Sequence, residues 1–206
     1  MKRNIPLGDF FLLKVNPVIR FLILADIATF SALGLLGPIF AIFVTEFIEG
    51  GTVEVAGVAA AIYLLTKSLT QIPAAALIDK ICGDKDDYWF LVGGMLVVNL
   101  VPLSYLLVSN PAELYFTQFL LGAATAFTFP SFMALFTHYV DGEKAGTTWG
   151  VYYTLIDIAQ AATAAIGGVL AASIGFEKVI YLVTSIGLLS MLFYVPIAPS
   201  LRKKPC

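Results

Sequence analysis

Three ionisable side chains interrupt long apolar runs: Asp26 in "LILADIATF", Lys67 in "YLLTKSLTQ" and Asp157 in "YTLIDIAQA". A charge at the centre of a bilayer costs roughly 2.5 to 3.5 kcal/mol, so each should face protein or water and find a partner. Lys67 lies 12 residues before Asp79, and Asp157 lies 12 residues after Ala145. Asp79 and Ala145 are expected at the same membrane surface, so Lys67 and Asp157 are predicted to lie at the same depth. We predict that Lys67 and Asp157 form an ion pair, as a gate or as a structural contact. Asp26 is predicted to handle a substrate or a proton, the alternative being a structural hydrogen bond to another helix.

The composition indicates a membrane protein. Of 206 residues, 59% are hydrophobic and 13% are charged, with a mean hydropathy of +0.90; soluble domains carry roughly 25% charged residues. A net charge of −2 without a basic face excludes nucleic acid. His138, Cys82 and Cys206 lie too far apart in the sequence to suggest a metal site, and we find neither a Gly-x-Ser-x-Gly nucleophile nor a phosphate-binding loop. We therefore expect no enzyme, no cofactor, no metal and no disulfide.

A helix needs about 20 mainly apolar residues to cross a bilayer. The stretches that meet this requirement are 17–48, 53–78, 88–108, 112–140, 144–173 and 177–197. The first is longer than a straight span requires, and Gly34, Gly37 and Pro38 offer a place for it to bend. Asn16 and Asn110 each precede a proline, a pattern typical of helix N-caps. The sequence thus predicts an all-α membrane protein of six transmembrane helices.

The basic residues orient these spans. Alternate ends collect the residues Lys2, Arg3, Lys14, Arg20, Lys80, Lys85, Lys144, Arg202, Lys203 and Lys204, whereas Lys178 lies at an opposite end with several glutamates. Cytoplasmic ends carry the excess of Lys and Arg, so both termini are predicted to be cytoplasmic in a plasma or inner membrane. Residues 1–16 are expected to form a cytoplasmic or interfacial segment, and residues 199–206 a basic cytoplasmic tail.

The chain contains an internal similarity. "ATFSALGLLGPIFAIFVTEF" aligns with "LLGAATAFTFPSFMALFTHY" at an offset of 92 residues. The residues that coincide are Pro38 with Pro130, Phe40 with Phe132, and Thr45 with Thr137. Since each repeat holds an odd number of helices, the second must enter the membrane from the opposite side. We predict an inverted 3+3 repeat with units 17–108 and 109–198, the alternative being chance similarity between apolar segments.

The charged link after the second span carries a family resemblance. "AALIDKICGDK" resembles the signature between helices 2 and 3 of major facilitator superfamily transporters, in which a small residue, an Asp, a Gly and basic residues follow at fixed spacing. The residues that fit are Ala75, Asp79, Lys80, Gly83 and Lys85; Asp84 stands where the family has a basic residue. The resemblance implies a latch that holds the outward-facing state. The alternative is a solvated loop that marks the membrane surface.

The resemblance also implies a central cavity lined by helices 1 and 4. It makes Asp26, Gln118, Phe132 and Phe136 candidates for substrate or proton contact, although phenylalanines are also common on lipid-facing helices. Gln118 stands four residues before Gly122, where the family often has an Arg linked to proton coupling. The helix 5 sequence "TAAIGG" lacks the family's antiporter glycine and proline, so neither proton coupling nor antiport follows.

The resemblance covers a single six-helix half, as in a half-size member, whereas the family usually has two such halves. Two copies inserted the same way round would supply both, with helix 2 of one against helix 5 of the other, so that Lys67 would meet Asp157 across a parallel homodimer. We therefore predict a secondary transporter of a small solute, working by alternating access in contact with membrane lipid. The alternatives are a non-transporting scaffold, an accessory subunit of another membrane protein, or a truncated transporter half.

Overall fold

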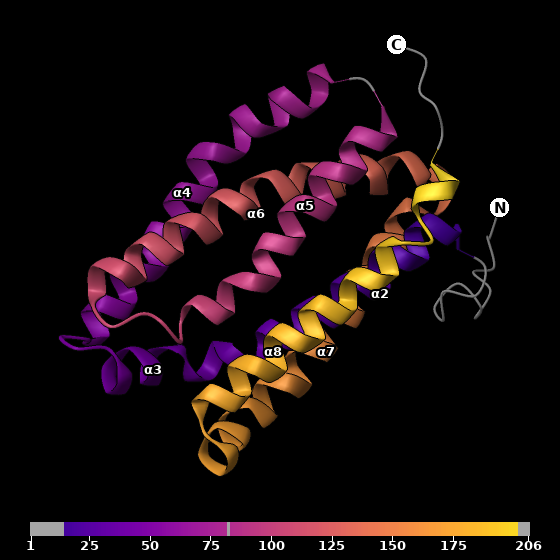
Figure 1. The fold of residues 1–206 in the computed structure, drawn as a ribbon. Coiled ribbons are helices and arrows are strands. Elements are labelled where there is room, and N and C mark those ends of the chain that lie inside the picture. The colour runs from indigo at the N-terminus through magenta and orange to yellow at the C-terminus, as the bar shows by residue number, and fades with distance from the viewer. Residues whose placement is uncertain (1–14, 82, 202–206) are drawn as a thin grey trace.

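The computed structural model describes residues 15–81 and 83–201, which form a bundle of long helices joined by short links (Figure 1). The α-helices are α2 (Pro17–Leu36), α3 (Phe40–Phe47), α4 (Val53–Lys80), α5 (Asp84–Ser104), α6 (Pro111–Tyr139), α7 (Ala145–Ile174) and α8 (Phe176–Ser190). The short 3-10 helices are η1 (Gly37–Ile39), η2 (Gly142–Lys144), η3 (Met191–Tyr194) and η4 (Ala198–Ser200). The predicted interfacial segment before Val15, the tail after Leu201 and both cysteines lie outside the described residues.

Six helical segments are long and apolar enough to cross a membrane, which confirms the predicted number of spans. The first runs from Pro17 to Phe47 as α2, η1 and α3, and the 3-10 turn at Gly37–Ile39 falls where a bend was predicted. Proline has no backbone N–H and its ring crowds the preceding turn, so Pro38 weakens the α-helix at the point where the 3-10 turn replaces it. The six-helix, all-α architecture is therefore as expected.

The predicted N-caps are confirmed in detail. The Asn16 side-chain oxygen accepts a hydrogen bond from the Val18 N–H at 2.9 Å, and that of Asn110 accepts one from the Glu113 N–H at 3.1 Å. Proline occupies the first helical position in both cases. A side-chain acceptor before a proline satisfies the free donors of the first turn, so these Asn-Pro pairs begin α2 and α6.

Helix α5 begins earlier and ends earlier than the hydropathy predicted. It starts at Asp84 rather than at residue 88, because Asp84, Asp86 and Asp87 form its first turn. Carboxylates are favourable there, next to the partial positive charge of a helix N-terminus, although they lower the local hydropathy. Gly83 precedes it with φ +145°, a conformation that L side chains rarely adopt. At the other end, α5 stops at Ser104 and the chain turns back toward α6.

The helices pack in a regular set of pairs. The principal pairs are α4 with α6, α5 with α6, α2 with α7, α2 with α8 and α5 with α8. Helix α4 consequently lies along one edge of the bundle beside α6 (Figure 1). A Cβ on Gly122 of α6 would lie 2.6 Å from the carbonyl oxygen of Tyr63 on α4, so this close crossing requires glycine. A Cβ on Gly167 of α7 would likewise collide with the Leu35 carbonyl of α2.

The two ends of the bundle differ in charge. The basic end holds the start of α2 and the α4–α5 and α6–α7 links, with Arg20, Lys80, Lys85 and Lys144. The acidic end holds the opposite links, with Glu46, Glu49, Glu54, Glu113 and Glu177 beside Lys178. The backbone N–H of Glu49 donates to the carbonyl of Ser109 at 3.0 Å and ties two links together at the acidic end. Which end faces the cytoplasm stays a prediction.

Candidate substrate cavity

A cavity of about 260 Å³ lies midway along the bundle, between α2, α4, α5, α6 and α7. Its lining includes two of the three charged residues found within apolar spans, Asp26 from α2 and Lys67 from α4. The rest is aromatic, hydroxyl or aliphatic, with Phe129 and Phe132 from α6, Tyr152 and Tyr153 from α7, and Leu91, Met95 and Val98 from α5. The fold therefore gathers one acidic and one basic group in a mainly apolar chamber.

Asp26 is almost completely buried, with 4% of its surface exposed. The Tyr152 hydroxyl on α7 donates to its Oδ2 at 2.8 Å, and the buried Tyr194 hydroxyl is a second neighbour. Packing of α2 against α7 brings Tyr152 to Asp26, and packing of α2 against η3 brings Tyr194. Sequence reasoning missed both tyrosines, although a tyrosine inside an apolar helix is itself a signal, since its hydroxyl normally needs a buried partner.

Lys67 is half-buried, and its Nζ lies 5.4 Å from the ring centroid of Phe129. This is the geometry of a cation–π contact. Among the described residues Lys67 has no carboxylate within ion-pair distance, and Asp157 is exposed on the outer side of α7. The two side chains are therefore not paired within one chain, and their pairing between two chains stays a prediction.

The other predicted substrate residues divide into two groups. Phe132 lines the cavity, and its ring centroid lies 5.3 Å from that of Tyr152. Phe136 lies outside it, fully buried against Trp149 with 4.0 Å between ring centroids. Gln118 is also buried elsewhere, where its amide donates to the Tyr105 hydroxyl at 3.1 Å. Asp26 and Phe132 thus both line the cavity, whereas Gln118 and Phe136 are buried outside its lining.

The signature residues lie at the basic end of α4 and in the link that follows. Ala75 and Asp79 border a shallow surface hollow between α4 and α6. Lys80 and Lys85 are exposed, and Gly83 makes the turn into α5. Asp79 is exposed and makes no hydrogen bond or ion pair with the part of the chain that the structure describes. The carboxylate remains accessible to another chain, and its latch role stays a prediction.

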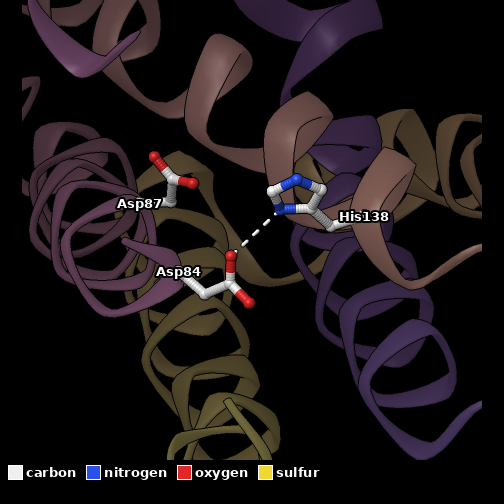
Figure 2. Close-up of side chains that lie close together, drawn as sticks. All are labelled: Asp84, Asp87 and His138. Carbon is white, nitrogen blue, oxygen red and sulfur yellow. Dashed lines mark hydrogen bonds and ion pairs between the residues drawn. The ribbon is translucent and has the colours of Figure 1, made fainter. Parts of the chain in front are cut away.

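Asp84, the departure from the family signature, joins α5 to α6. It is 2% exposed, its Oδ1 lies 3.0 Å from His138 Nδ1, and its Oδ2 accepts a hydrogen bond from the Tyr139 hydroxyl at 2.8 Å. Figure 2 shows the Asp84 carboxylate turned toward the His138 ring, with Asp87 nearby on α5. Ligand atoms of Asp84, Asp87 and His138 lie within 4.8 Å of one another, which could hold a metal ion. Both Asp84 oxygens are already engaged, one with His138 and the other with Tyr139.

A bundle of apolar, membrane-length helices around a cavity with buried charged groups is typical of membrane transport proteins. The sequence matches the Major Facilitator Superfamily over residues 22–205, and the chain belongs to that family. It is accordingly a transporter-family protein and not an enzyme.

Two known proteins extend the comparison. A quinolone resistance transporter from Acinetobacter baumannii is 26% identical over 143 residues, which cover 68% of this chain and 32% of that protein. A crystal structure of the POT family transporter PepTSo matches with a TM-score of 0.73 and 12% identity, covering 91% of this chain and 38% of that one. The chain therefore spans about a third of the length of each, and the second likeness concerns the fold alone.

Proposed function

We propose that this chain is one six-helix bundle of a secondary transporter, and that two copies inserted the same way round form a parallel homodimer. A small solute moves by alternating access through the cavity that each bundle lines, with the basic end on the cytoplasmic side. The observation that carries the proposal is that two of the helices have little of their surface buried against the rest of the chain. In α4 and in the α7 span only 11% of the most apolar 18-residue window is buried, against 39% to 44% in the other spans.

The outer face of α7 suits a helix partner. Asp157, Ala161, Ala165 and Gly168 are all exposed and recur at intervals of three or four residues, so they form one stripe along the helix. Small residues let two helices approach closely inside a membrane, where tight packing replaces the hydrophobic effect as the driving force. A second bundle placed on this stripe would also bring a group toward Asp157, which has no ion-pair partner among the described residues.

The packing pairs support the inverted repeat of units 17–108 and 109–198. In such a repeat α2, α4 and α5 correspond in order to α6, α7 and α8. The observed α4–α6 pair then corresponds to the α7–α2 pair, and the α5–α6 pair to the α8–α2 pair; both counterparts are observed. The α5–α8 pair maps onto itself. Every principal contact thus has its counterpart, as an internal two-fold relation requires.

The ion pair of the proposed dimer joins Lys67 to Asp157 of the partner subunit. Lys67 lies on α4 and Asp157 on α7, the two spans with the least buried surface. Neither has an oppositely charged group within 4.0 Å in residues 15–81 and 83–201. The similarity to a quinolone resistance transporter favours a small organic solute over an inorganic ion.

The oligomeric state tests the dimer directly. We would measure the mass of the purified protein in lipid nanodiscs by native mass spectrometry over a dilution series, and we expect a persistent dimer. Ala161→Trp should disrupt it by placing a large ring in the small-residue stripe. The matched control is Leu189→Trp, since Leu189 is an exposed residue of α8, outside the proposed interface. A wild-type chain that stays monomeric would refute the homodimer.

Cysteine accessibility tests alternating access without knowledge of the solute. Thr125 lines the cavity, so Thr125→Cys in a background of Cys82→Ser and Cys206→Ser reports on its exposure to water. An impermeant maleimide should label it in proteoliposomes from either side, and Asp79→Asn should shift the labelling toward the cytoplasmic side by releasing the latch. Protection that is unchanged in every condition would instead favour a scaffold or an accessory subunit.

A further inference from the structure

We infer that the cavity recognises a small aromatic solute that carries a carboxylate, and that Lys67 binds this carboxylate. The inference rests on the proposed transport function and specifies the chemical class of its substrate. It follows from three features of the cavity: the accessible charge, the lining, and the volume.

The accessible charge is positive. Lys67 is the cation among the lining residues, and its ammonium group carries three hydrogen-bond donors. The contact that the described residues give it is the face of Phe129, which accepts no conventional hydrogen bond. An ammonium at this depth is costly without an anion, so an arriving carboxylate gains both an ion pair and charge-assisted hydrogen bonds.

Asp26 does not supply the anion that Lys67 requires. It has no Lys67 nitrogen within 4.0 Å, its Oδ2 accepts from Tyr152, and only 4% of its surface is exposed. A solute that enters the cavity therefore meets the lysine more readily than the aspartate. The asymmetry favours an anionic solute over a cationic one, although both signs of charge are present in the wall.

The remaining lining selects the body of the solute. Phe129, Phe132 and Tyr153 supply aromatic surfaces, while Leu91 and Met95 supply aliphatic ones. Flat rings gain from stacking or edge contacts with such side chains. The volume of about 260 Å³ lies just below the range of ligand pockets, roughly 300 to 1,000 Å³, and this favours a solute of one or two fused rings.

Binding of such a solute would also affect the proposed interface between the two subunits. The carboxylate competes for Lys67 with Asp157 of the partner subunit, so filling the cavity exchanges an ion pair between chains for one with the solute. Occupancy of the cavity and closure of the interface are thereby linked through one side chain.

The test compares three naphthalene probes of equal ring size on the purified protein in nanodiscs: 2-naphthoate, the neutral 2-naphthamide and the cationic 2-naphthylmethylammonium. We expect 2-naphthoate to bind about tenfold or more tightly than the amide, as a hydrogen-bonded charge warrants. Lys67→Arg should keep the preference and Lys67→Gln should abolish it. Lys178→Gln is the matched control, because Lys178 is exposed at the far, acidic end.

Equal affinity for the three probes, preference for the ammonium, or binding of none of them would overturn the inference. A preference for naphthoate that survives in Lys67→Gln would do the same. Each variant is also weighed by native mass spectrometry, so a failure of the dimer is seen separately from a failure of recognition. If naphthoate binds through Lys67 but is not moved across proteoliposomes, the transport proposal fails while the assignment of the cavity stands.

Discussion

The hydrogen bond from Tyr139 to Asp84 should contribute about 1.5 to 3 kcal/mol to stability, the range for bonds to charged groups. The bond is short, at 2.8 Å, and the acceptor is 2% exposed, so solvent does not screen it. Tyr139→Phe removes the donor and leaves the ring in place. His138, whose side chain is 38% exposed, should contribute less, under about 1 kcal/mol, because water screens it.

A double-mutant cycle isolates this bond from the other contacts of Tyr139, which also approaches the carbonyl of Ser200. Tyr139→Phe, Asp84→Ala and the double variant would be unfolded by SDS titration in mixed micelles, followed by circular dichroism. We expect Tyr139→Phe to cost at least about 1 kcal/mol less in the Asp84→Ala background than in the wild type. A coupling below about 0.5 kcal/mol would show that Asp84 and Tyr139 do not stabilise each other and would refute the reasoning.

Three further predictions concern the packing, a helix start and the interface. Gly122→Ala should destabilise the protein by about 1 to 3 kcal/mol in the same unfolding assay, because the new Cβ meets the α4 backbone, whereas Gly93→Ala, with open space around it, should not. Asn110→Ala should cost about 1 kcal/mol by removing the N-cap of α6, and a loss of no more than a few tenths would contradict that role. Lys67→Ala should weaken the dimer, and adding Asp157→Asn should restore part of the affinity; strictly additive effects would exclude the ion pair.

The sequence predicted the features that depend on local chemistry. The length of the apolar stretches identified the spans, and Asn16 and Asn110 marked helix starts. Gly37 and Pro38 marked the break in the first span. The start of α5 was misplaced because an acidic first turn is stabilised by the helix dipole, which hydropathy does not measure.

The candidate site was only partly predictable. Asp26 and Lys67 stand out because charge is rare in apolar spans, but their neighbours depend on which helices pack together. Tyr152 meets Asp26 through the α2–α7 contact, and nothing in the spacing of these two residues shows that. Gln118 was assigned to the cavity by its position on α6, yet its amide is turned to Tyr105. The direction of a side chain around a helix depends on tertiary packing.

The pairing of α4 with α6 and of α2 with α7 affects how the chain is made. Helix α4 is synthesised before α6, yet α6 is its principal neighbour. Until α6 arrives, the span that carries Lys67 lacks both the glycine crossing and the Phe129 ring that accommodate it in the finished bundle. We therefore expect α2 and α4 to remain unpacked in the bilayer, or bound to an insertion factor, until α6 and α7 have been synthesised. Assembly is completed only when the last helices enter.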